Sequence, residues 1–329
     1  MTPNDIVAAV LKALQPSVQY SWYDASTRYL QEVTHEKTPR SLENDLRSIE
    51  WLNRKLEGVM LHEITKDLVH QIITERQKPT IFYYEHGQIR ECTPGISAIN
   101  RFLTTFRAVL YRARDEWEWI NRAPRIKSLK GEKNRIRWIS REEANRLIAY
   151  LPQHLAIMAE FSLQTGLRRH NVTHLKWSEV DLARKMAWVL PSESKNRKAL
   201  AVPLSNKACK ILEKQFKEYG KISKWVFPYR DKPVKQTSTK AFRDALERAE
   251  IDDFRWHDFR HTWASWHIQK GTPLMVLKEL GGWSCLRMVQ RYAHLSSEHL
   301  RAYVDHAEDK ATLPITAQEN TLKSFEFVA

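Results

Sequence analysis

Six side chains in the later part of the sequence are of types that could cleave a phosphodiester without a metal ion. A phosphodiester gains negative charge on its oxygens as it is attacked. Two guanidinium groups can hold those oxygens through paired hydrogen bonds that lysine cannot reproduce. Arginines beside a tyrosine also favour its phenolate, which makes the tyrosine a candidate nucleophile. The candidate catalytic residues are Arg168, Lys195, His257, Arg260, Trp283 and Tyr292.

The three remaining side chains of this set would support the attack. Lys195, on a predicted hairpin tip, could give a proton to the leaving alkoxide. His257 could hold a phosphate oxygen or manage the proton of the tyrosine. Trp283 could donate its indole N–H to the phosphate or simply pack.

The stretch FRWHDFRHTW, residues 254–263, raises a question about charge. It places Arg260 three residues after His257 on one face of an expected helix, among several aromatic side chains. A guanidinium in such surroundings is costly to bury without an anionic partner. That partner is either a carboxylate elsewhere in the fold or an anion of the substrate.

The overall charge favours an anionic partner. The 329 residues carry 53 Lys and Arg against 39 Asp and Glu, a formal net charge of +14, most of it after residue 130. Such a balance indicates nucleic acid before an acidic membrane surface. No apolar run reaches about 18 residues, so no spanning helix is predicted. The first residues lack the basic start and long apolar run expected of a secretory signal. The three cysteines are far apart, which fits a reducing compartment and no disulfide framework.

Hydrophobic periodicity divides the chain into two parts that must position these residues. The earlier part is predicted to be helical, with a hairpin over 80–93. A basic, aperiodic stretch over 121–137 has the composition of a linker. The predicted helices of the earlier part span 21–33, 39–56, 65–77 and 95–120, and a short amphipathic helix is expected over 6–14.

The later part is predicted to hold helices around one hairpin. Ser140 and Glu143 form a capping box, and a single helix is expected over 284–296. Thr272 is expected to cap a helix that has Pro273 in its first position. Gly271 and Gly281 are expected helix stops, and the two hairpin strands are predicted over 186–191 and 199–204.

Four stretches of the later part resemble the tyrosine recombinases, and the phage-integrase type in particular. The resemblance rests on their order and on the nine-residue step from Trp283 to Tyr292. Each is weak alone, and together they leave little room for accident. They are QTGLRRHN (164–171), ESKNRK (193–198), WHDFRHTW (256–263) and LGGWSCLRMVQRYAHLS (280–296).

The resemblance implies a mainly α fold with a small antiparallel β-sheet. It implies a helical core-binding domain followed by an α+β catalytic domain of the tyrosine-recombinase type. Phe325 and Phe327 make the end of the tail apolar, and by resemblance it could dock on a neighbouring protomer. The expected parts are an N-terminal segment (1–17), the core-binding domain (18–125), a basic linker (126–137), the catalytic domain (138–306) and a tail (307–329).

The resemblance also implies the activity. It is a site-specific recombinase or integrase that cleaves and rejoins DNA strands through a 3′-phosphotyrosyl link, for integration or excision of a mobile element. No ATP, cofactor or metal is implied. The implied partners are double-stranded DNA with an inverted-repeat core site and three further copies in a homotetramer, with a monomer as one free state. An accessory DNA-bending or directionality protein is compatible with it, a membrane is not, and the bacterial cytoplasm or nucleoid is the expected location.

Two other functions use the same residues. A type IB topoisomerase-like enzyme would relax supercoils as a monomer, and the integrase-type stretch around Tyr292 argues against it. A DNA-binding regulator without catalysis would not need the full set of six residues. The family usually has an acidic residue three positions after the first arginine, where this chain has Asn171, so weaker orientation of Arg168 is expected.

Several assignments have competitors in the sequence. Arg169 could replace Arg168, although the TGLR register favours the latter, and Arg197 or Lys198 could replace Lys195. His261 is expected to make structural hydrogen bonds. A metal site at His257, His261 and His267 is disfavoured because no acidic ligand follows and Arg260 is adjacent. The expected DNA-binding residues are Arg101, Arg107, Arg112, Arg125, Lys127, Lys130, Arg169, Arg197 and Lys198, although a solvated face would also explain the arginines of 95–120.

Overall fold

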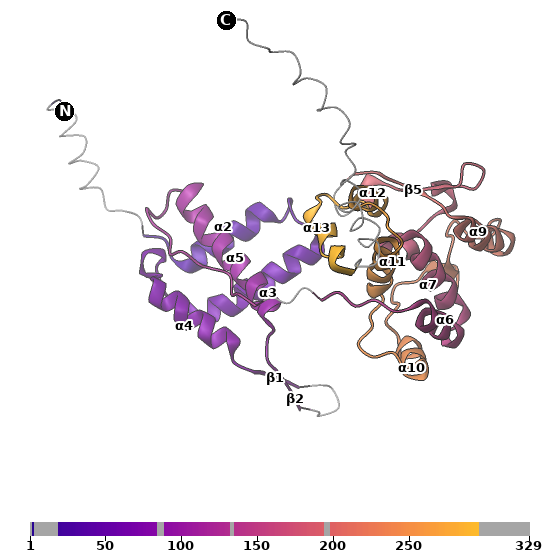
Figure 1. The fold of residues 1–329 in the computed structure, drawn as a ribbon. Coiled ribbons are helices and arrows are strands. Elements are labelled where there is room, and N and C mark those ends of the chain that lie inside the picture. Colours follow the sequence, from indigo (N-terminus) through magenta and orange to yellow (C-terminus); the bar gives the residue numbers. More distant parts are fainter. Residues whose placement is uncertain (1, 3–18, 84–88, 132–134, 194–197, 296–329) are drawn as a thin grey trace, which may run out of the picture. The chain divides into compact units, whose positions relative to one another are not determined.

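The protein is mainly helical with small antiparallel sheets, as the computed structural model in Figure 1 shows, which confirms the predicted fold class. The chain divides into two compact units, Met1–Asn134 and Arg135–Ala329. The structure describes residues 2, 19–83, 89–131, 135–193 and 198–295. The helix expected over 6–14 and the tail 307–329 lie outside these residues. Among the described helices, none has the length and apolar content needed to cross a bilayer.

The first unit is built around one long helix. Helix α5 packs against the three other helices of the unit, and its predicted apolar stripe is buried from Ile99 to Leu110. It ends at Asp115, earlier than predicted, because Glu118 adopts a positive φ of 54° that a helix cannot continue. The helices are α2 (Trp22–Val33), α3 (Pro39–Lys55), α4 (Lys66–Gln77) and α5 (Ile96–Asp115), with a 3₁₀ turn η1 at Leu61–Glu63.

The hairpin predicted in this unit is confirmed. Strand β1 (Thr80–Tyr83) pairs with β2 (Ile89–Cys92) in antiparallel register, with Thr80 opposite Cys92. Part of the basic stretch that follows α5 is attached to it. The Asn100 side chain bonds the main-chain N–H and carbonyl of Leu129 at 2.7 and 3.1 Å. The residues expected to be a linker therefore begin with a segment anchored on the first unit.

A buried polar cluster joins α2, α3 and α5. The Asp45 carboxylate accepts hydrogen bonds from the Tyr29 hydroxyl at 3.1 Å and the Thr105 hydroxyl at 2.8 Å. It also forms an ion pair with Lys37. Asp45 is only 8% exposed, so a partner is required for its charge. This cluster connects all three helices through directional contacts to one carboxylate, in addition to the apolar packing between them.

The second unit surrounds α11 (Asp258–Gln269), which packs against α7 (Gln153–Thr165) and α12 (Leu274–Gly281). The three-stranded sheet of this unit has the order β3–β4–β5, and β6 pairs with β7 in a separate two-stranded sheet. In the predicted hairpin, Met186 of β4 lies opposite Pro203 of β5. The remaining elements are α6 (Arg141–Tyr150), α8 (Arg169–Thr173), η2 (Trp177–Glu179), β3 (Val180–Asp181), β4 (Met186–Val189), η3 (Pro191–Glu193), β5 (Leu200–Pro203), α9 (Asn206–Tyr219), β6 (Pro228–Tyr229), β7 (Lys232–Pro233), α10 (Lys240–Arg248), α13 (Arg287–Gln290) and η4 (Ala293–Leu295).

Three local predictions for this unit need correction. Pro273 occupies the cap position of α12, because the Thr272 hydroxyl pairs with the His267 ring at 3.0 Å instead of capping the helix. Gly282, with φ of 61°, ends α12 in place of Gly281. The helix expected over 284–296 is two short pieces, α13 and η4, within the residues that the structure describes. The capping box at the start of α6 is confirmed.

We predict that Asp45→Asn loosens the first unit. The change leaves Lys37 without its ion pair, and because the Lys37 side chain is about one-third exposed we expect a loss of about 2 kcal/mol in local stability. Hydrogen exchange followed by mass spectrometry should show roughly 30-fold faster exchange in α2, α3 and α5, with α11 unchanged. Glu43→Gln, which removes an exposed carboxylate of α3, is the control and should change little. Equal protection in both variants would contradict the role given to Asp45.

Candidate active site

Arg260 lies in the first turn of α11 with only 4% of its surface exposed. Its two terminal nitrogens donate to the carbonyls of Gly166 and Gly281, each at 2.6 Å. The guanidinium also lies over the Trp283 ring, 4.2 Å from its centroid. The main chain and an aromatic face thus hold the guanidinium in one orientation, and its remaining N–H groups are available to an incoming oxygen.

No carboxylate neutralises this buried cation among the residues that the structure describes. The nearest acidic residue in sequence is Asp258, and its carboxylate is engaged by Arg135 at 3.0 Å and by the Arg255 N–H at 2.7 Å. Burial and, to a smaller extent, the charge of Arg168 together lower the pKa of Arg260 to about 9. Two cations held close together without an acidic partner make a site for an anion.

A tight turn between α7 and α8 brings Arg168 to the same place. Gly166 ends α7 with φ of 62°, and a Cβ on it would lie 2.1 Å from the Trp263 ring. Only glycine therefore allows the close approach that also directs the Gly166 carbonyl at Arg260. Two residues later Arg168 occupies the cap position of α8, half-buried, and burial lowers its pKa.

The two arginines line a pocket of about 540 Å³. Trp283 and the buried Asn171 also contribute to its wall. Among the described residues, the lining contains no Asp or Glu, so an anion that enters meets positive charge there without competition. The cations that line it are Arg168, Lys198, Arg260 and Lys278.

Tyr292 lies behind this pocket rather than in its wall. Its side chain is 2% exposed, and its hydroxyl oxygen is 2.7 Å from Nδ1 of His261. Burial raises the pKa of Tyr292, against the opposing effects of Arg260 and Arg291. Burial also lowers the pKa of His261 to about 4, with His257 acting in the same direction. The free protein therefore holds a neutral tyrosine hydrogen-bonded to a neutral histidine.

His257 lies at the start of α11, three residues before Arg260. It is the N-cap residue of α11 and its side chain is exposed. Partial desolvation by the surrounding chain lowers its pKa, and the Arg260 charge lowers it further. Its ring meets the His261 ring edge to face at 5.1 Å. His267 instead pairs with the Thr272 hydroxyl.

The structure brings together Arg168, Arg260 and Trp283 around one pocket and places Tyr292 and His261 next to it. Lys195 and Arg197 lie outside the described residues, and Lys198, three positions after Lys195, lines the pocket. Sequence reasoning missed Lys278, which has no motif of its own. It also missed the contact of His261 with Tyr292, because a hydrogen bond across 31 positions leaves no periodic signal.

The residues expected to bind DNA differ in their present contacts. Arg112 forms ion pairs with Glu32, Glu36 and Glu116, and Arg107 donates to the Ile126 carbonyl and the Ser128 hydroxyl. Arg112 is therefore already neutralised. Arg169 donates to the Lys235 carbonyl at 3.3 Å and is exposed, and the other exposed basic side chains in the described part of this set are Arg101, Arg125, Lys127, Lys130 and Lys198.

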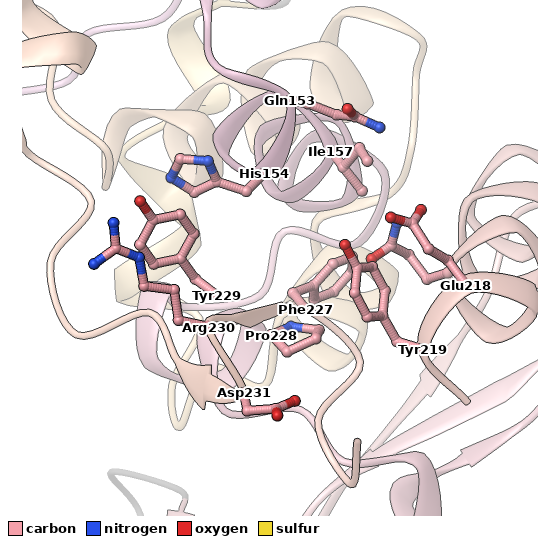
Figure 2. Close-up of a pocket in the computed structure, with 11 residues that line it drawn as sticks. Gln153, His154, Ile157, Glu218, Tyr219, Phe227, Pro228, Tyr229, Arg230 and Asp231 are labelled. Atoms are coloured by element: carbon pink, nitrogen blue, oxygen red, sulfur yellow. The ribbon is translucent and has the colours of Figure 1, made fainter. Parts of the chain in front are cut away.

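A second pocket of the same unit contains none of the predicted site residues. Figure 2 shows His154 and Tyr229 facing one another on one side of it and Tyr219 with Glu218 on the other. Its volume is about 280 Å³. Glu218 and Asp231 accompany its Arg230, so this pocket lacks the uncompensated positive charge of the first one.

Comparison with known proteins decides the family. The model of the phage integrase family matches residues 137–299. The integrase of Salmonella phage P22 is 37% identical over 309 residues, which cover 84% of this chain and 76% of that protein. The chain belongs to the phage integrase family. A shufflon-specific DNA recombinase of Escherichia coli is 29% identical over 200 residues, 59% of this chain and 50% of that protein.

Solved structures agree on the fold. A lambda integrase dimer bound to a COC′ core site matches 87% of this chain and 80% of that chain, with a TM-score of 0.63 and 16% identity. A lambda integrase tetramer bound to a Holliday junction matches 84% and 78%, with a TM-score of 0.62 and 16% identity. The integrase of transposon Tn1549 with transposon right end DNA matches 86% and 99%, with a TM-score of 0.67 and 14% identity.

These findings confirm the resemblance to the tyrosine recombinases. They also confirm the prediction that the protein is a site-specific recombinase, an enzyme that transfers DNA strands. The topoisomerase-like and regulator alternatives are less consistent with a relative that matches most of the chain.

We predict that inorganic sulfate binds between Arg168 and Arg260. At about ten times its dissociation constant it should stabilise the protein by about 1.4 kcal/mol, seen as a higher midpoint of thermal unfolding than in chloride of equal ionic strength. Because the pKa of Arg260 is about 9, the effect should fade as the pH rises above that value and the guanidinium loses its proton.

Arg168→Gln should remove most of this stabilisation. Arg169→Gln, which changes the exposed neighbouring arginine, is the matched control and should keep it. An equal sulfate effect in the two variants would mean that the anion acts on the whole surface and that the pocket has no special affinity.

Proposed function

We propose that this recombinase cleaves DNA by attack of Tyr292 on the scissile phosphate, giving a 3′-phosphotyrosyl link and a free 5′-hydroxyl. The observation that carries the proposal is the buried Arg260, which has main-chain and aromatic contacts but no carboxylate partner among the described residues. A phosphodiester between Arg260 and Arg168 would supply the missing negative charge. The anionic partner of Arg260 is then the phosphate of the substrate and not a carboxylate of the fold.

The other residues take the roles that their positions allow. Arg168 and Arg260 hold the phosphate oxygens and stabilise the charge that develops on them in the transition state. Trp283 keeps Arg260 in place and closes one side of the pocket. Lys195 lies in sequence between β4 and β5, close to the pocket-lining Lys198, and donates the proton that the leaving 5′-oxygen needs.

The covalent link makes the reaction reversible. The phosphotyrosyl bond retains the energy of the phosphodiester that was broken, and the 5′-hydroxyl of a second duplex can attack it and restore Tyr292. Neither ATP nor a metal ion is needed for such an exchange. The exchange of strands between two duplexes at an attachment site would serve integration or excision of a mobile element.

We also propose the partners that this exchange requires. The DNA is a core site with inverted repeats, each bound by one copy of the protein through both units. Strand exchange between two such sites uses four copies. The exposed basic residues Arg101, Arg125, Lys127 and Lys130 of the first unit contact the phosphate backbone, which supplies affinity that falls as salt rises.

A covalent trap tests the nucleophile. Purified protein is mixed with DNA fragments that flank its own gene, denatured in SDS and examined for protein that stays attached. We predict a site-specific adduct that Tyr292→Phe abolishes and Tyr229→Phe, a change of an exposed tyrosine, leaves intact. Arg168→Lys should slow adduct formation by about 10²-fold to 10³-fold, because lysine cannot reproduce the paired contacts.

The other outcomes of the trap are equally informative. An adduct without site preference would favour a topoisomerase-like activity. Tight binding with no adduct on any fragment would favour a DNA-binding regulator and contradict the proposed role of Tyr292.

The tail offers a test of assembly. Residues 307–329 lie outside the described part of the chain, and their apolar end is proposed to dock on a neighbouring protomer. Deletion of 320–329 should lower the fraction of DNA in four-copy complexes, measured by native gel electrophoresis, and leave binding to one core site unchanged. Phe325→Ser with Phe327→Ser should have the same effect if apolar contact is the cause. Unchanged synapsis in both variants would remove the docking role.

A further inference from the structure

Among the described residues, two side chains hydrogen-bond the Tyr292 hydroxyl, His261 and Arg291, and of these two only the histidine can accept a proton. The His261 Nδ1 is 2.7 Å from the hydroxyl oxygen, and the two side chains are 8% and 2% exposed. We propose that His261 is the group that accepts the proton of Tyr292 when the tyrosine attacks. This inference rests on the proposed function, in which Tyr292 is the nucleophile.

The alternative proton acceptor in the sequence is His257, and its geometry is poorer. His257 is the exposed N-cap of α11 and contacts His261 through the ring edge, at 5.1 Å between centroids. A general base must lie within hydrogen-bond reach of the proton that it takes. His261 meets that requirement, and it is also removed from water, which would otherwise compete for the proton.

The groups that face His261 explain why it acts only with substrate present. Burial is the main effect that disfavours its protonated form. The charges of His257, Arg291 and Arg260 act in the same direction, and Asp258 opposes them. In the free protein the proton therefore stays on the tyrosine oxygen. The proposed transfer uses the tautomer of His261 that carries its proton on Nε2, in which Nδ1 accepts a hydrogen bond from the hydroxyl. A phosphodiester anion between Arg168 and Arg260 would offset the positive charges and make an imidazolium less costly.

The proton balance of the step is complete. The O–H bond of Tyr292 breaks and an N–H bond forms at Nδ1 of His261. A bond forms from the tyrosine oxygen to phosphorus, and the bond from phosphorus to the 5′-oxygen breaks. The 5′-oxygen takes its proton from a separate acid, the role proposed for Lys195. In rejoining, the attacking 5′-hydroxyl gives its proton back to that acid and His261 returns its proton to the departing phenolate, so the enzyme ends as it began.

The test uses the full chain and a nicked core-site DNA in which the leaving 5′-oxygen is replaced by sulfur. A thiolate needs no acid to leave, so the rate of covalent adduct formation reports on the tyrosine side of the reaction. His261→Ala should lower this rate by about 10²-fold to 10⁴-fold. Added imidazole should restore a large part of it, with a pH dependence that follows the neutral form of imidazole.

Two further variants separate proton transfer from a structural role. His261→Gln keeps a hydrogen-bonding side chain next to Tyr292 but cannot take a proton, so it should bind DNA as the wild type does and remain slow. His267→Gln changes another half-buried histidine of α11, one that pairs with Thr272, and should be as fast as the wild type. Recovery of the wild-type rate in His261→Gln, or a lack of imidazole rescue in His261→Ala, would overturn the inference.

The outcome also separates this inference from the proposed function. If the wild-type protein forms an adduct that Tyr292→Phe abolishes, the nucleophile is established whatever the histidine variants do. Wild-type rates in both His261 variants would then refute His261 alone. An adduct that survives in Tyr292→Phe would refute the proposed function as well.

Discussion

The arrangement of the catalytic unit depends on the burial of one positive charge. Arg260 is held in the interior by two main-chain carbonyls and the face of Trp283, with no carboxylate to neutralise it among the described residues. Main-chain oxygens carry only partial charge, so they orient the guanidinium and leave most of its charge uncompensated. A carboxylate in an ion pair with Arg260 would instead have neutralised the charge of the guanidinium. The site is therefore stable enough to fold and still favourable to an anion.

Several unusual features of the chain follow from this arrangement. The carbonyls that receive Arg260 belong to two glycines, and a Cβ on either would lie about 2 Å from a tryptophan ring, Trp263 for Gly166 and Trp283 for Gly281. The tryptophans in turn fill the space between α7, α11 and α12. Asp258, which could have neutralised Arg260, is occupied by Arg135. The two glycines, the two tryptophans and the pairing of Asp258 with Arg135 thus all leave the Arg260 guanidinium available to bind an anion.

Much of this could be predicted from sequence, and the limits have physical causes. The helices of the first unit, the two hairpins and the capping box at Ser140 are local features with clear periodicity or cap chemistry, and they were predicted well. The convergence of Arg168 and Arg260 followed from motifs in a known order. The partner of Tyr292 was not predictable, because it depends on how the chain after α12 turns back onto α11. His257, which was expected either to hold a phosphate oxygen or to manage the tyrosine proton, is one helical turn away from His261, which contacts Tyr292.

The central claim is that Arg168 and Arg260 neutralise the charge of the scissile phosphate, and a change in that charge tests it most directly. A core-site DNA can carry a neutral methylphosphonate at the scissile position in place of the charged phosphodiester. The rate of strand cleavage by Arg168→Ala would be measured on both substrates, relative to the wild type. We predict a large defect on the phosphodiester and a much smaller one on the methylphosphonate, because no negative charge remains to be stabilised. Equal defects on the two substrates would contradict the account.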